Sequence, residues 1–274
     1  MNHVDPEIVK GILCKLILTF LIVSPSIPCY TGGILGAASA GPSLHRKRRC
    51  LTYMLDHVLY LLFGFMDVFA LLVVAAALFR IPVLKAGPTL VLVAVLASLL
   101  SYLNRMVMNW SVFDLLAQTA LSALFFVLVL KFRLFWSMII VSSGLMVFLP
   151  LQFTIYVLLT RFDFLPDAIA SHNTGFVFAL QLLTDASCLL IACALRLGKR
   201  GYRFMPQAPH DFQERILYFS PRYEKLTLAL AANLINIMFT LYLTLNGWIY
   251  FSYAISLIVL FTMLILFDQT DKKR

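Results

Sequence analysis

Seven apolar runs dominate this sequence, and each is long enough, or nearly so, to cross a lipid bilayer as a helix. A spanning helix needs about 20 mostly apolar residues. The chain of 274 residues is 61% hydrophobic and only 13% charged, against about 25% charged residues in soluble domains. We therefore predict an all-α polytopic membrane protein with about seven transmembrane helices. The runs are residues 55–79, 88–103, 111–130, 134–159, 175–195, 226–243 and 247–267.

The basic residues are distributed unevenly between these runs. The formal net charge is +9, which in a soluble protein would suggest nucleic acid as a partner. Here the basic residues lie in short segments between apolar runs, so the lipid bilayer is the expected partner, and nucleic acid is not. Alternate segments after Met54 carry 14 Lys and Arg on one side and 2 on the other. The positive-inside rule places the 14 in the cytoplasm. It predicts a multi-pass protein of the cell membrane with a cytoplasmic C-terminus.

The first 53 residues break this charge rule, because they add six Lys and Arg to the outer side. Three interpretations stay open: a cleaved signal segment, a further reentrant or spanning segment, and a true start of translation at Met54. On the third, residues 1–53 are dispensable for insertion. We accordingly divide the chain into an N-terminal extension (1–53), a transmembrane domain (54–267) and a short cytoplasmic tail (268–274).

Two carboxylates, Asp67 and Asp185, fall near the middle of apolar runs. A charged group at the bilayer centre costs roughly 2.5–3.5 kcal/mol, so such side chains face the bundle interior and have partners. Because no Lys or Arg lies at that depth, we expect the two carboxyl groups to be protonated or hydrogen-bonded to Asn233 and Asn236. They then act either as a proton or cation path or, the interpretation we favour here, as polar contacts that hold helices together.

Other polar residues fall near the ends of the runs. Arg105 and Asp114 are positioned to form an ion pair at the outer face. A basic anchor follows the fifth run, where positive side chains are attracted to anionic headgroups; its members are Arg196, Lys199, Arg200 and Arg203. Phe212, Ile216 and Phe219 then recur at helical spacing, which predicts a short amphipathic helix on the inner surface.

Motifs for chemistry are missing from the sequence. The five histidines have no metal-ligand spacing, and the chain has no HExxH, GxSxG or Walker sequence. We therefore expect no catalytic, cofactor-binding or metal-binding residues, and we do not expect an enzyme.

The order of the first three runs is similar to that of a known family. The first run ends on residues 71–82 (LLVVAAALFRIP), the second on 99–105 (LLSYLNR) and the third on 130–133 (LKFR). Over residues 54–267 this order resembles the multi-pass membrane N-terminal sensor regions associated with GHKL histidine kinases of Gram-positive, Paenibacillus-like bacteria. The chain departs from that family because only residues 268–274 follow the last run, with no phospho-accepting His segment and no ATP lid.

The resemblance implies a non-catalytic sensory or signalling module without its output domain. Such a module would bind an external or lipid-borne cue and act on a cytoplasmic signalling partner, or through self-association. The alternative is a small transporter, or a transporter-accessory subunit, that uses the intramembrane carboxylates. Deep polar residues that converge inside the bundle favour the transporter, and a bundle poor in polar groups favours the sensor.

Overall fold

The computed structural model describes residues 44–82, 86–108, 110–162, 175–205 and 223–272. The chain divides into two units, Met1–Val58 and Leu59–Arg274. In the first unit, the described residues form the N-terminal part of one helix. The contacts below all lie within the second unit. The predicted amphipathic helix and residues 1–43 of the predicted extension lie outside the described residues.

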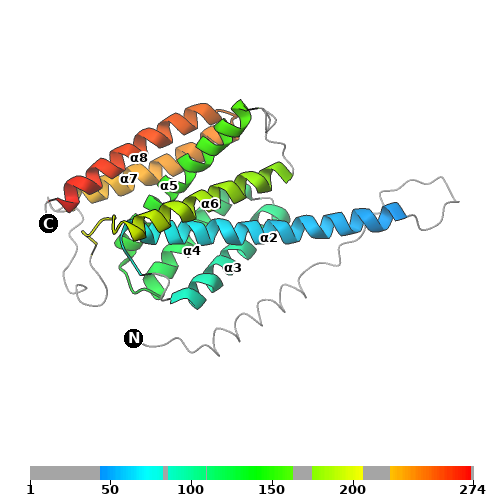
Figure 1. The fold of residues 1–274 in the computed structure, drawn as a ribbon, viewed down its shortest axis with the longest axis horizontal. Helices are drawn as coiled ribbons and strands as arrows, with labels where there is room; N and C mark the ends of the chain where they lie inside the picture. Colours follow the sequence, from blue (N-terminus) through cyan, green and yellow to red (C-terminus); the bar gives the residue numbers. More distant parts are fainter. Residues whose placement is uncertain (1–43, 83–85, 109, 163–174, 206–222, 273–274) are drawn as a thin grey trace. The chain divides into compact units, whose positions relative to one another are not determined.

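All regular structure in the described residues is helical, as predicted (Figure 1). Six helices are long and apolar enough to cross a membrane, and the third predicted run forms a shorter apolar helix, Phe113–Leu128. The elements are α2 (Leu44–Leu78), α3 (Gly87–Tyr102), a π-helical turn η2 (Leu103–Val107), α4 (Ser111–Leu128), α5 (Leu134–Arg161), α6 (Gly175–Leu197), α7 (Glu224–Leu245) and α8 (Ile249–Asp271).

Two helix ends differ from the predicted bounds. Helix α2 begins at Leu44, eleven residues before the apolar run, and so includes the last residues of the predicted extension. The basic residues Arg46–Arg49 are good helix formers, so low hydropathy does not end the helix there. Helix α8 continues to Asp271, through the first part of the predicted tail. Hydropathy indicates where a helix becomes apolar, which need not be where it begins or ends.

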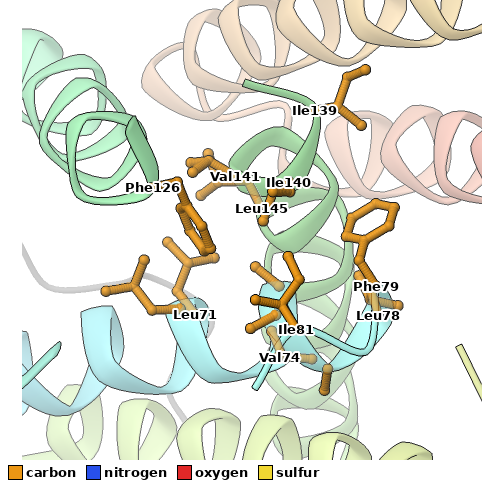
Figure 2. Packing of buried hydrophobic residues seen from close by; sticks show 14 of the residues in the cluster. Leu71, Val74, Leu78, Phe79, Ile81, Phe126, Ile139, Ile140, Val141 and Leu145 are labelled. Carbon is orange, nitrogen blue, oxygen red and sulfur yellow. The ribbon is translucent and has the colours of Figure 1, made fainter. Parts of the chain in front are cut away.

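Helix α5 packs against α4, α6, α7 and α8, and also against α2. Helices α7 and α8 lie side by side along it (Figure 1). The last third of α2, from Val68 to Leu78, supplies much of the core together with side chains of α4 and α5. Figure 2 shows Leu71 and Val74 of α2 with Ile140 and Leu145 of α5 in this cluster.

A glycine allows the close contact between α2 and α5. A Cβ atom built on Gly144 would lie 2.6 Å from the Cβ of Ala75 and 3.3 Å from its Cα. Small residues let helix backbones approach closely, which is how helices gain packing energy in lipid, where burial alone provides little. Gly144 and Ala75 therefore fix the separation of these two helices.

One end of the bundle is joined by an aromatic cluster, Phe79, Tyr202, Phe204 and Phe267, which we call the clasp. Its ring centroids lie 5.3 to 6.2 Å apart. The Tyr202 N–H donates to the Leu78 carbonyl at 2.8 Å, and the Arg203 N–H donates to Asp271 Oδ1 at 2.7 Å. The segment after α6 thus contacts the C-terminal ends of α2 and α8. These basic-rich ends share one end of the bundle, as the alternation of charge predicted.

Candidate functional site

Asp67 of α2 and Asp185 of α6 come together inside the bundle. Gln181, one turn before Asp185 on the same face of α6, donates its Nε2 hydrogen to Asp67 Oδ2 at 2.8 Å. The carboxyl groups of Asp67 and Asp185 lie within reach of a shared hydrogen bond. Nearby, the rings of Phe63 and Phe178 stack across the same seam with centroids 5.0 Å apart. We call Asp67 and Asp185 the carboxyl pair.

Most of the oxygen atoms of the carboxyl pair have no donor. Asp67 Oδ1 and both side-chain oxygens of Asp185 are buried and have no hydrogen-bond partner among the described residues. A carboxylate only accepts hydrogen bonds, so a bond between the two groups requires a proton on one of them. Two adjacent carboxylates in apolar surroundings cannot both stay ionised without a counter-charge. The pair therefore needs at least one shared proton or a bound cation.

Of the two alternatives predicted for the carboxyl groups, hydrogen bonds from Asn233 and Asn236 are not found among the described residues, whereas protonation stays a prediction. Asn233 and Asn236 do not contact the carboxyl pair, because they lie on the face of α7 that packs against α5 and α8. The Asn233 amide donates to Ser142 Oγ at 3.5 Å and Met263 Sδ at 3.3 Å. The Asn236 amide donates to Met146 Sδ at 3.3 Å and Ser256 Oγ at 3.4 Å. Among the described residues, the hydrogen-bond donor found for the carboxyl pair is Gln181, a residue that the sequence reasoning missed. Its one-turn spacing from Asp185 in an apolar run was the available signal.

The structure contains the predicted ion pair of Arg105 and Asp114, and its place at the outer face stays a prediction. Arg105 Nε lies 2.5 Å from Asp114 Oδ2, with the Arg105 side chain 50% exposed and the Asp114 side chain fully buried. The π-helical turn η2 carries Arg105, and Asp114 lies in the first turn of α4, where a negative charge favours the helix. Ser101 Oγ also donates to Asp114 Oδ2, at 3.0 Å. Asp114 thus accepts from both an arginine and a serine.

The basic anchor lies at the clasp end of the bundle. Lys199, Arg200 and Arg203 are exposed, whereas Arg196 is half-buried and donates to the Ile81 carbonyl at 3.4 Å. The sequence predicted the charges but missed the clasp, because the residues that form it come from three separate segments.

The described residues contain no cluster of three or more His, Cys, Asp or Glu side chains that could hold a metal ion. Comparisons of the chain with protein families, characterised proteins and solved structures find no match. The geometry of the carboxyl pair is therefore the main basis for a functional assignment.

Proposed function

We propose that this protein is a small transporter of the cell membrane that moves protons, with the carboxyl pair as its proton-binding site. The observation that carries the proposal is the contact of two membrane-embedded carboxyl groups whose remaining oxygens have no donor in the described residues. Such a site binds a proton because two adjacent carboxylates repel each other in apolar surroundings, and one bound proton removes that repulsion. Ionisable groups inside a bundle are typical of proton relays.

A purely structural contact fits the pair less well. Polar groups that hold helices together gain stability when their hydrogen bonds are satisfied, whereas each unsatisfied buried group costs about 1–3 kcal/mol. The Asn cluster of α5, α7 and α8 connects helices, because Asn233, Asn236 and Thr240 each contact a polar side chain on a neighbouring helix, although the side-chain oxygens of Asn233 and Asn236 also lack donors. The carboxyl pair differs because its groups are ionisable, so that a proton or a cation can satisfy the three oxygens that lack donors. This difference moves our preference from the sensory hypothesis to the transporter.

In the sensory hypothesis, the clasp would transmit helix movements to a cytoplasmic partner. Because the clasp connects the ends of α2, α6 and α8, a ligand that shifts these helices would change the surface offered to a cytoplasmic partner. That hypothesis requires no proton movement. Transport measurements therefore distinguish the two functions.

The test is proton flux into liposomes that contain the purified protein and an entrapped pH-sensitive dye. With an imposed pH gradient and a potassium–valinomycin potential, the wild-type protein should acidify the lumen, and Asp67→Asn and Asp185→Asn should abolish that flux because an amide cannot ionise. The matched control is Asp268→Asn, at an exposed pair with Lys272, which should keep the wild-type rate. Far-UV circular dichroism of each variant should match the wild-type spectrum, which checks that the variant is folded. A wild-type protein that moves no protons, or Asn variants that move them at the wild-type rate, would refute the proposal.

A further inference from the structure

The two groups of the carboxyl pair have different hydrogen-bonding surroundings. Gln181 Nε2 donates to Asp67 Oδ2 at 2.8 Å, from α6 to α2. Asp185 lies one turn after Gln181 on the same helix, a spacing at which side chains are neighbours. Even so, both side-chain oxygens of Asp185 are buried without a hydrogen-bond partner in the described residues. The donor found there therefore serves Asp67 and not Asp185.

The polar neighbours of Asp185 along α6 do not stabilise a negative charge. Thr184 is fully buried, and its Oγ1 donates to the Leu180 carbonyl of the same helix at 2.9 Å. Cys188, one turn after Asp185, is a buried thiol, and a thiol is a weak donor. Asp185 has no exposed surface, so solvent outside the bundle does not hydrate it either.

The charged groups near the pair also distinguish the two carboxyl groups. The positive charge of Arg105, from the turn η2, acts on Asp67. The titratable groups that interact with Asp185 are Asp67 and Cys188. Tyr60 of α2 also interacts with Asp67. Tyr60 and Cys188 are neutral when protonated, so neither supplies a counter-charge. In the described residues, positive charge therefore acts on Asp67 rather than on Asp185.

These surroundings decide where a single shared proton is more stable. Hydrogen bonds to a carboxylate favour its charged form, and burial without such bonds favours the neutral acid. With the proton on Asp185, its hydroxyl group can donate to Asp67, which then accepts from both Asp185 and Gln181. With the proton on Asp67, the Gln181 amide would donate to a neutral group, and Asp185 would carry a buried charge with no donor other than Asp67.

We propose that Gln181 gives the two carboxyl groups different roles: Asp67 stays ionised, and Asp185 binds and releases the transported proton. This inference rests on the proposed function. Binding adds one proton to a side-chain oxygen of Asp185 and release removes it, so nothing else is consumed. Gln181 is a positioning residue, because it acts through Asp67 and does not itself exchange a proton.

The test is an infrared titration of each carboxyl group by itself. Asp185→Asn leaves Asp67 as the one carboxyl group of the pair, and Asp67→Asn leaves Asp185. The carbonyl stretch of the protonated acid is followed against pH, and the spectrum of the double Asn variant is subtracted to remove the bands of other carboxyl groups. The introduced amide can donate to the remaining carboxylate in both variants, so it does not create a difference between them. Asp185 should stay protonated to a higher pH than Asp67.

A substitution of Gln181 then tests its role directly. Gln181→Met removes the donor and keeps an unbranched side chain of similar length. Added to Asp185→Asn, it should raise the midpoint of the Asp67 band by about one pH unit, because a hydrogen bond to a charged group contributes about that much. Added to Asp67→Asn, it should leave the midpoint of the Asp185 band unchanged. The matched control is Gln118→Met in α4, where Gln118 Nε2 lies 3.4 Å from Asp114 Oδ1; it should leave both midpoints unchanged.

Several results would overturn the inference. A merely structural role of Gln181 would move both midpoints or neither, and a bond from Gln181 to Asp185 would move the Asp185 midpoint. Protonation of Asp67 to a higher pH than Asp185 would reverse the assignment, and the two Asn variants test this even if Gln181→Met does not fold. These titrations require no transport. Reversed roles with normal proton flux would therefore leave the proposed function standing, whereas a wild-type protein without proton flux would overturn that function.

Discussion

Replacement of Gly144 by alanine should destabilise the bundle by forcing α2 and α5 apart. The added Cβ would lie 2.6 Å from the Ala75 Cβ, whereas carbon atoms in favourable contact are about 3.5–4.0 Å apart. The two helices must therefore separate by about 1 Å at this point. Neither atom belongs to a flexible side chain that could rotate away, so the backbones themselves have to move.

The expected cost is in the upper part of the range for overpacked cores, about 2–3 kcal/mol, because such insertions cost roughly 1–3 kcal/mol. The core around this contact is closely packed: Leu72, Ala75, Ile140 and Met146 are all fully buried. A separation of 1 Å would weaken dispersion contacts along the whole seam. The assay is unfolding in mixed micelles with rising SDS, followed by far-UV circular dichroism.

A control adds a Cβ where there is free space, and a rescue removes the Cβ that opposes residue 144. Gly87→Ala, where a Cβ meets nothing within 4 Å apart from its chain neighbours, should change stability much less than Gly144→Ala, because it displaces no packed atom and adds only the small local cost of a side chain before Pro88. Ala75→Gly in the Gly144→Ala background removes the opposing Cβ and should restore part of the loss. A stable Gly144→Ala protein, or a double variant with strictly additive effects, would refute the close approach.

The remaining predictions concern topology and pH. A cytoplasm-dependent reporter fused after Arg274 should be active and an export-dependent reporter inactive, because 14 of the 16 basic residues after Met54 lie in segments assigned to that side; the opposite result would invert the topology. Burial, with the nearby charges of Asp268 and Asp271, raises the pKa of Tyr202 above its ordinary value near 10. The contribution of Tyr202 to stability should therefore be complete below about pH 10 and be lost as pH rises further, and Tyr202→Phe should remove this dependence in SDS unfolding.

Helix positions could be predicted from the sequence because lipid imposes a simple condition on the chain. Every apolar run had to become a helix to satisfy its backbone groups, and predicted bounds such as 175–195 differ by two residues or less from α6 (Gly175–Leu197). The ion pair of Arg105 and Asp114 was also predictable, because only a short turn separates the helices that carry them. The short connection along the chain brings these two side chains together.

The partners of Asp67 and Asp185 could not be predicted in the same way. Depth in the bilayer follows from position in an apolar run, but contact between two helices depends on their order around the bundle and on their rotation. Asn233 and Asn236 also lie near the middle of an apolar run, yet α7 packs against α5 and α8. The sequence of an apolar helix such as α7 does not indicate which of its faces packs against which neighbouring helix. Long-range packing decided this part of the site.

The position of the carboxyl pair along α2 bears on how transport would proceed. Toward Arg105, the seam beside Asp67 contains Ser98, Ser101 and Tyr60. Toward the clasp, α2 continues from Val68 to Leu78 with almost every side chain buried and apolar. If the protein moves protons as proposed, release on the clasp side would require α2 to separate from its neighbours there. A transporter that alternates between two states needs such a closed half, and the clasp, which joins the ends of α2, α6 and α8, is the contact that would have to open.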